Sequence, residues 1–374
     1  MIDTEPQLAV LLEERKARRN APPYLPQEDG SIAALLQGWF EQVEPGAIVS
    51  GVSRMGGGAS KEQFIFTLTR GDEGRQYVLR MDPLEAITET SRQREHEILK
   101  AMRGVVPVPD PVWLDAEGAH FPRPAVIMEF IGGVTKPKSD GVSVTGLGTV
   151  LGDPLREMIR PQFVEALARV HNFDWAGANL PSFAVPSGDA NQATRWLIEF
   201  WKELYEQDVV TKEPVMRLAT QWLQENVPSC DKICVVHGDY RTGNYLFDEA
   251  TGKLTAILDW EMCHLGDHHE DLAWSMQPVF GTNIDGIFRG SDIAAPEQFY
   301  ADYTAASGNP VDPARLHYFI IFNAWKSYIL VSTLGVRAAR HAHNHQDVLL
   351  TMLAGTGPLF VDELARLLQM EESQ

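Results

Sequence analysis

The chain has 374 residues, 44% of them hydrophobic, and a formal net charge of −19 at pH 7. A chain of this length and apolar content can bury a large core divided between about two structural units. The negative charge disfavours nucleic-acid binding, because a nucleic-acid surface requires clustered basic side chains.

The amino-terminal segment is not expected to act as a targeting signal. The opening residues, MIDTEPQLAV, lack the basic start and apolar core of a signal peptide, which predicts a cytoplasmic protein. Residues 1–20 are charged and mildly amphipathic. Ser31 is expected to cap a helix with the apolar-periodic sequence IAALLQGWFEQV. No motif assigns a role to residues 1–45, which could pack on the amino-terminal part of the fold or on a partner.

A glycine-rich segment follows, with the sequence SRMGGGASK at residues 53–61. It lies between apolar runs at residues 48–52 and 64–68, as expected for a loop that covers phosphates between two strands. Because the alternating QFIFTLT that follows predicts a strand and not a helix, the segment is not a P-loop. A flexible hairpin is the alternative. The candidate phosphate-binding residues are Gly56, Gly57 and Gly58.

The next predicted strand, residues 77–80, ends in Arg80, where a kinase would usually have a lysine. Arginine keeps the charge and can hold phosphate oxygens with two hydrogen bonds. A helix is predicted over residues 88–103. Its Glu95 is the expected partner of Arg80, with Glu97 in reserve, and surface pairing is the alternative for either glutamate. An apolar run at residues 124–131 then predicts a further strand, which Gly132 and Gly133 close.

The most informative motif is HGDYRTGN at residues 237–244, followed by ILDWE. It places Asp239, Asn244 and Asp259 at the spacing of a kinase catalytic loop. Phosphoryl transfer requires a carboxylate that orients the attacking hydroxyl, and it requires an amide oxygen and a second carboxylate that hold magnesium. The three residues suit these roles in that order. The alternative, that they are ordinary turn residues, is common for an isolated tripeptide but not for this full string.

Short apolar runs on either side of the motif predict how these residues are supported. Residues 233–236 and 254–258 are expected to be buried strands, and residues 248–253 form the turn of a hairpin. Asn244 and Asp259 would then lie on adjacent strands. Arg241 is the candidate that stabilises charge on the transferred phosphoryl group, with a solvated arginine as the alternative. Glu261 is expected either to assist the metals or to act as a supporting polar residue.

The remaining titratable clusters suggest structural roles. His264, His268 and His269 near Asp267, like the HAHNH sequence at residues 341–345, are predicted to be packing or surface histidines and not metal ligands. The three cysteines form no disulfide framework and indicate reduced thiols. The apolar stretch 317–336 contains Asn323, Lys326 and Ser327, which predicts a buried helix and no membrane span. Further helices are predicted at residues 156–171, 190–207, 214–226, 296–306, 313–340 and 360–370.

The strings HGDYRTGNYLFD, AILDWEMCHLGD and EDLAW resemble the aminoglycoside phosphotransferase and choline kinase group of protein-kinase-like enzymes. They are also similar to the phosphotransferase domains linked to some acyl-CoA dehydrogenases. The resemblance implies an α+β, bilobal protein-kinase-like fold. A small β-rich N-lobe with its extension would occupy residues 1–130, and a larger, mainly helical C-lobe residues 131–374. It also implies that Asp271 holds the backbone of the catalytic loop.

The same resemblance implies an ATP-dependent kinase with Mg²⁺, with GTP as an alternative nucleotide. Glu129 and Ile131 would contact adenine at the hinge between the lobes. The acceptor would be a hydroxyl of a small molecule: an aminoglycoside, a macrolide, an amino alcohol, a sugar or a hydroxyacyl-CoA. The departure at Arg80 supports one alternative, a nucleotide-binding pseudokinase. A histidine-based metalloenzyme is the third hypothesis. No pattern indicates the oligomeric state.

Overall fold

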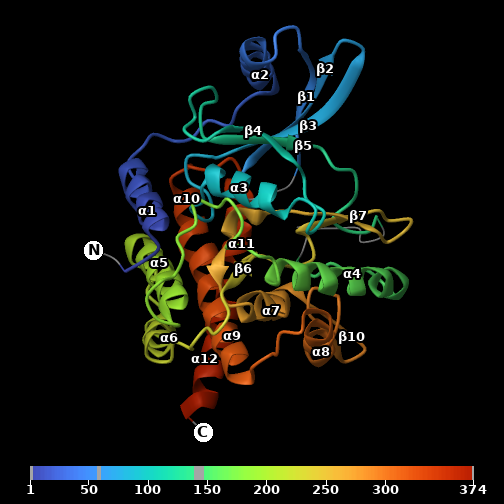
Figure 1. Ribbon diagram of the computed structural model, residues 1–374. Helices are drawn as coiled ribbons and strands as arrows, with labels where there is room; N and C mark the ends of the chain where they lie inside the picture. Colours follow the sequence, from blue (N-terminus) through green and yellow to red (C-terminus); the bar gives the residue numbers. More distant parts are fainter. Residues whose placement is uncertain (1–2, 57–59, 139–146, 373–374) are drawn as a thin grey trace.

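The computed structural model describes residues 3–56, 60–138 and 147–372. A sheet with helices packed on it forms the upper part of the molecule, and helices form most of the lower part (Figure 1). The predicted α+β, bilobal fold with a small β-rich N-lobe and a larger, mainly helical C-lobe is confirmed. The antiparallel sheet has the order β1-β2-β3-β5-β4, with the bounds β1 Ile48–Arg54, β2 Glu62–Arg70, β3 Glu73–Met81, β4 Pro111–Asp115 and β5 Ala125–Glu129.

The two faces of the sheet are separated by the alternation of side chains along β3. Tyr77, Leu79 and Met81 point to one face, where they join the apolar core under helix α2 (Asp29–Val43). Val78 points to the other face and packs with the residues of helix α3 (Arg92–Met102). Because side chains two apart share a face, Arg80 points toward α3 as well.

Two helix starts differ from the prediction. Helix α3 begins at Arg92, four residues later than expected, because Ser91 is its cap and accepts a hydrogen bond from the Arg94 N–H. Helix α2 begins at Asp29, so Ser31 lies inside the helix and is not its cap. The earlier start is stabilised by the backbone hydrogen bond from Ile32 N–H to the Glu28 carbonyl at 3.0 Å.

Helix α1 (Pro6–Arg18) leads the chain but packs on the C-lobe, beside α5 (Figure 1). Its Leu12 is fully buried in a cluster of C-lobe side chains. Arg15 is buried too and forms ion pairs with Glu89, in the segment before α3, and with Asp208 at the end of α5 (2.7 Å). The amino-terminal helix therefore contacts elements of both lobes.

The C-lobe surrounds the predicted motif with helices, most of which were predicted with ends within a few residues. Helix α11 was not predicted. The helices are α4 Asp153–His171, α5 Gln192–Asp208, α6 Pro214–Glu225, α7 His269–Ser275, α8 Pro296–Ser307, α9 Pro313–Tyr328, α10 Val336–Arg340, α11 Asp347–Ala354 and α12 Gly357–Glu372. A π-helical segment, Ile329–Gly335, joins α9 to α10. Three short antiparallel pairs complete the lobe: β6 Cys234–Val236 with β9 His264–Gly266, β7 Tyr245–Phe247 with β8 Leu254–Ile257, and β10 Thr282–Ile284 with β11 Ile287–Arg289.

Among the described residues, two helical stretches are long and apolar enough to cross a membrane by length and composition alone. The first, Pro313–Arg340, is 78% buried over its most apolar window, so packing in the C-lobe accounts for its composition. The second, Asp347–Gln369, is 22% buried over the corresponding window.

Candidate active site

The catalytic-loop motif connects β6 to β7, and hydrogen bonds to a residue of α7 fix its backbone. The carboxylate of Asp271 accepts hydrogen bonds from the N–H groups of His237 (2.7 Å) and Gly238 (2.8 Å). Gly238 has φ +84°, and a Cβ there would lie 2.7 Å from the carbonyl oxygen of Met262, so only glycine fits. The chain that carries Asp239 is thus held in one position. The backbone role that the resemblance implied for Asp271 is present.

Three donors converge on the Asp239 carboxylate. Its Oδ1 accepts hydrogen bonds from Arg241 Nε (2.9 Å) and from Trp274 Nε1 (2.6 Å). Its Oδ2 accepts one from Asn244 Nδ2 (2.6 Å). The guanidinium of Arg241 also stacks over the ring of Phe280, 4.7 Å from its centroid. This arrangement orients an anionic carboxylate, and the Asp239 side chain keeps 15% of its surface exposed.

Asn244 and Asp259 flank the β7–β8 hairpin, one just before β7 and the other just after β8. The Leu258 N–H donates to the Asn244 carbonyl at 2.8 Å, which joins the two ends. Asp259 adopts a left-handed conformation, φ +66°, and its side chain is 31% exposed. Burial opposes ionisation of Asp259, but the attraction of Arg80, Arg241 and His237 outweighs it and lowers its pKa. The carboxylate therefore stays charged.

Arg80 connects the two lobes at the site. Its Nη1 pairs with Glu95 Oε1 at 2.9 Å, and its Nη2 pairs with Asp259 Oδ1 at 2.7 Å. Glu97 lies elsewhere and accepts hydrogen bonds from the N–H (3.0 Å) and hydroxyl (2.8 Å) of Ser182. Burial opposes the charge on Arg80, yet the carboxylates around it raise its pKa.

Glu261, a residue of the C-lobe, lies among basic residues of the N-lobe. Its carboxylate is 3.4 Å from Lys61 Nζ and 3.5 Å from Nη2 of Arg80 and of Arg92, and it accepts a hydrogen bond from Ser60. These contacts favour the supporting polar role of Glu261. Sequence reasoning did not single out Lys61, although it ends the predicted glycine loop. Gly56 is described, whereas Gly57 and Gly58 lie outside the described residues.

The predicted hinge lies beside the β7–β8 hairpin. Glu129 is the last residue of β5, and its N–H donates to the Asp110 carbonyl at 2.9 Å. Ile131 follows, and its N–H makes no hydrogen bond with another described residue. Val134 and Phe247 exchange two backbone hydrogen bonds of 2.9 and 3.0 Å. The segment that leaves the N-lobe is therefore tied to β7. Residues 139–146, between β5 and α4, lie outside the described residues.

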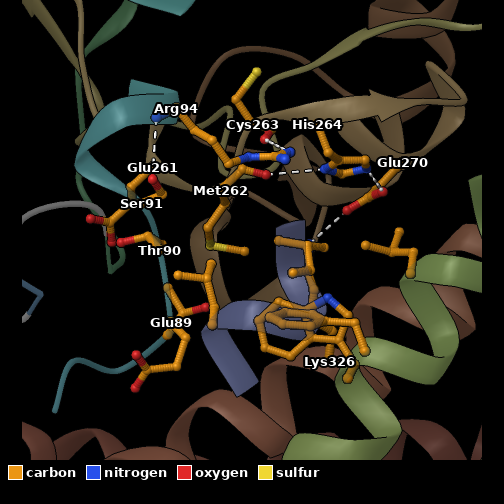
Figure 2. Close-up of a pocket in the computed structure, with 16 residues that line it drawn as sticks. Glu89, Thr90, Ser91, Arg94, Glu261, Met262, Cys263, His264, Glu270 and Lys326 are labelled. Carbon is orange, nitrogen blue, oxygen red and sulfur yellow. Dashed lines mark hydrogen bonds and ion pairs between the residues drawn. The ribbon is translucent and has the colours of Figure 1, made fainter. Parts of the chain in front are cut away.

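A buried cluster of charged residues contacts the catalytic loop on the side of α7 and α9. The sequence analysis did not predict this cluster. Figure 2 shows its three members, His264, Glu270 and Lys326, at a small cavity of about 40 Å³. Lys326 Nζ is 2.8 Å from the Glu270 carboxylate and 3.3 Å from the Gly238 carbonyl, and it lies over the Trp274 ring. The sequence offered one signal, a lysine in a helix that is otherwise apolar.

His264 lies between two acceptors, the Glu270 carboxylate and the Met262 carbonyl, each at 3.0 Å. Both ring nitrogens must donate a hydrogen bond, so the ring is cationic. Burial opposes this charge, but Glu270 outweighs it and raises the pKa of His264. The cluster therefore holds two cations on either side of one carboxylate.

Asp267, His268 and His269 bring possible metal ligands within 4.8 Å of one another in the described part of the chain. Both ring nitrogens of His269 are already used. Nδ1 contacts Asp267 Oδ1 at 2.6 Å, and Nε2 accepts the Asp312 N–H at 2.9 Å. These hydrogen bonds favour the predicted packing role over metal binding.

Comparison with known proteins agrees with this geometry. Residues 51–318 match the model of the family described as the phosphotransferase enzyme family. The mouse acyl-CoA dehydrogenase family member 10 is 29% identical over 248 residues, which are 63% of this chain and 22% of that protein. The Arabidopsis thaliana probable acyl-CoA dehydrogenase IBR3 is 26% identical over 299 residues, 74% of this chain and 35% of that protein. The chain thus spans about a third or less of the length of these relatives.

Solved structures share the fold. A Ralstonia eutropha protein assigned as an aminoglycoside phosphotransferase superposes with a TM-score of 0.65 at 20% identity, covering 90% of this chain and 98% of that chain. A Plasmodium vivax ethanolamine kinase superposes with a TM-score of 0.53 at 12% identity, covering 94% of this chain and 95% of that chain. Because the family model covers more than half of the sequence, the chain belongs to the phosphotransferase enzyme family, whose members transfer phosphate to the hydroxyl groups of small molecules.

Proposed function

We propose that this phosphotransferase is an ATP-dependent kinase that transfers the γ-phosphate to a hydroxyl of a small metabolite. The observation that carries the proposal is the set of three hydrogen bonds that orient the Asp239 carboxylate beside the hairpin bearing Asn244 and Asp259. A solved structure with this fold, a spectinomycin phosphotransferase, contains ADP and its antibiotic, and it covers 92% of this chain with a TM-score of 0.51. Its nucleotide supports ATP, and we keep GTP as the alternative.

The oxygen atoms at the hairpin suit Mg²⁺. The amide nitrogen of Asn244 donates to Asp239, which leaves its Oδ1 without a hydrogen bond from any described residue. The Asp259 carboxylate is partly exposed, and Mg²⁺ prefers such hard oxygen ligands. Asn244 and Asp259 would hold the metal. Bound there, the metal would neutralise charge on the phosphates.

The N-lobe would hold the nucleotide. Arg80, oriented by Glu95, and the loop of Gly56, Gly57 and Gly58 would bind the phosphates. The backbone at Glu129 and Ile131 would contact adenine, because the Ile131 N–H is available as a donor. We place the boundary between the lobes at residues 130 and 131.

The reaction would be an in-line displacement. The acceptor oxygen forms a bond to the γ-phosphorus while the bond from that phosphorus to the β,γ-bridging oxygen breaks, and ADP leaves. Asp239 orients the hydroxyl and takes its proton, a role that typically contributes about 10²–10⁴-fold to the rate. Arg241, fixed against Asp239, would stabilise the charge on the transferred group.

The acceptor is proposed from the relatives. The names of the curated relatives, which are acyl-CoA dehydrogenases, favour a hydroxylated metabolite such as a hydroxyacyl-CoA. The relatives of known structure favour amino alcohols and antibiotics, because they include ethanolamine and choline kinases and a macrolide phosphotransferase. We place the hydroxyacyl-CoA class first.

The test is transfer of label from γ-labelled ATP, and in parallel from GTP, to hydroxyacyl-CoA thioesters, hydroxy acids, amino alcohols, sugars, macrolides and aminoglycosides. Asp239→Asn is expected to lower transfer about 10³-fold, while ADP affinity by calorimetry stays near the wild-type value. Asp72→Asn, at an exposed aspartate, is the matched control. Full activity in Asp239→Asn would refute the mechanism. ADP binding without transfer to any acceptor would favour the pseudokinase hypothesis.

A further inference from the structure

A second cavity, of about 410 Å³, lies outside the catalytic loop. Its walls come from α1, from the segment between β3 and α3 with the start of α3, and from the loop between β4 and β5. We call it the α1–α3 cavity. Cavities of roughly 300–1,000 Å³ commonly bind small molecules. It reaches solvent at Glu14 and Glu117, whose side chains are exposed, whereas Asp239, Asn244 and Asp259 do not line it.

Although the chain as a whole is strongly acidic, basic side chains outnumber acidic ones on the walls of the cavity by five to four. Five basic side chains line it, and four of them have carboxylate partners: Arg18 with Glu89 at 2.8 Å, Lys61 with Asp82 at 3.1 Å, Arg92 with Asp82 at 3.1 Å, and Arg94 with Glu5. The fifth, Arg123, has no hydrogen bond or ion pair with any residue that the structure describes. Its Nε atom is also buried without a partner.

Arg123 is therefore a cation without a direct carboxylate partner among the described residues. Burial, and after it the charge of Arg18, lower the pKa of Arg123, and the opposing attraction of Asp82 and Glu89 is too weak to reverse this, so the protein destabilises the charge. An anion between the guanidinium groups of Arg123 and Arg18 would offset the burial of Arg123 and its repulsion from Arg18. Arginine suits this role because it binds phosphate and carboxylate with two parallel hydrogen bonds.

Hydroxyl groups complete the site. Thr88, Thr90 and Ser91 line the same cavity, and they can donate hydrogen bonds to an anion. Ser91 is the cap of α3, so the first turn of that helix, with its amide groups, also faces this region and favours negative charge. The hydroxyl groups come from the segment before α3, Arg18 comes from α1, and Arg123 comes from the loop between β4 and β5. All of these donors line the same cavity.

We propose that the α1–α3 cavity binds a small molecule with a phosphate or carboxylate group, and that the anionic group lies between Arg123 and Arg18. This site is distinct from the cleft that would hold ATP and the acceptor. Its inner wall includes Lys61 and Arg92, which also contact Glu261 at 3.4 and 3.5 Å. The cavity and the cleft thus share one buried charge network.

The test is calorimetric titration of the full chain with inorganic phosphate and, separately, with citrate, in the presence of saturating ADP and Mg²⁺ to occupy the cleft. The phosphate titration and the citrate titration distinguish the two anion classes. At least one anion is expected to bind the wild-type protein. Arg123→Gln is expected to weaken that binding about tenfold, as for the loss of one charge-assisted hydrogen bond.

The matched control is Arg75→Gln, which removes an exposed arginine of β3 outside the cavity and is expected to leave anion affinity unchanged. If Arg123→Gln does not fold, Arg123→Lys replaces it, because it keeps the charge but loses the bidentate geometry and is expected to bind several-fold more weakly. Because the dependence on Arg123 identifies the site, the test stands even if the nucleotide does not bind. Equal anion affinity in the wild type and the Arg123 variants, or no binding of either anion to the wild type, would overturn the proposal.

Discussion

The two sides of the candidate site are held in different ways. On the loop side, every group that fixes Asp239 belongs to the C-lobe: its carboxylate is oriented by Arg241, Asn244 and Trp274, and its backbone is anchored by Asp271. On the phosphate side, the central contact joins different lobes, because Arg80 of β3 pairs with Asp259 beyond β8.

This difference separates a preformed part of the site from one that depends on the position of the lobes. Neutral and charged hydrogen bonds within one lobe persist when the lobes move. The Arg80–Asp259 ion pair, in contrast, depends on how the two lobes are placed. It also occupies one oxygen of Asp259, a proposed metal ligand, so binding of metal and nucleotide would have to rearrange the ion pair. The loop side is expected to be rigid, and the phosphate side adjustable.

Among the changes that test this difference between the two sides, Arg80→Met is expected to have the largest effect, because it breaks the phosphate side. It would leave Asp259, Glu95 and Glu261 without their shared cation. It would also remove a charged contact to the phosphates, which costs about 3 kcal/mol of binding free energy, or roughly a hundredfold in ADP affinity. Calorimetry with ADP and Mg²⁺ measures this directly. Arg80→Lys keeps the charge and should retain part of the affinity. Unchanged ADP binding in Arg80→Met would show that Arg80 does not hold the phosphates.

A smaller effect is expected on the loop side from Trp274→Phe. This change removes the 2.6 Å hydrogen bond to Asp239 but keeps an aromatic ring beside Lys326. We expect kcat to fall about tenfold, the value of one hydrogen bond to a charged group, with ADP affinity unchanged. Trp222→Phe, at a half-buried tryptophan of α6 whose ring packs against His317 and Tyr318, is the control. Equal kcat in both variants would remove Trp274 from the positioning of Asp239.

The smallest effect concerns the support beneath the loop and depends on pH. The pKa of His264 is raised above 6.5, so its cation contributes stability that is fully present below that pH and is lost as the pH rises through the folded-state value. The wild type should therefore exceed His264→Gln in free energy of unfolding by a larger margin near pH 6 than near pH 9.

Urea unfolding of both proteins at the two pH values measures this difference. His96→Gln provides a control of opposite sign, because burial lowers the pKa of His96 and its charging destabilises the fold at acidic pH. If the wild type and His264→Gln differ by the same free energy at both pH values, His264 is not the cation that its two acceptors imply.

The local parts of the site were predictable because their signals span few residues, and the fold followed from the family resemblance. The spacing of Asp239, Asn244 and Asp259 lies within one loop and one hairpin, and Glu95 was expected to pair with Arg80 because it lies in the helix that follows β3. The prediction that Ser31 caps α2 was wrong, because the helix begins three residues earlier than that cap implies and a backbone hydrogen bond stabilises the earlier start.

Contacts between distant segments were not predictable. Lys61 meets Glu261 two hundred positions later, and no local pattern distinguishes it from a surface lysine. Lys326 interrupted an apolar helix, which signalled a buried charge but not its partner Glu270. Trp274 appeared only as part of a family string. Each of these residues acquires its role from packing between elements, which a single sequence does not reveal.

The position of α1 bears on how the two lobes can rotate. Arg15 pairs with Glu89 on the N-lobe side and with Asp208 on the C-lobe side, and the Glu85 N–H donates to the His343 carbonyl at 3.0 Å. The hinge is thus not the sole connection between the lobes. A rotation that opens the cleft would have to stretch these links, so the amino-terminal helix limits how far the two lobes can separate.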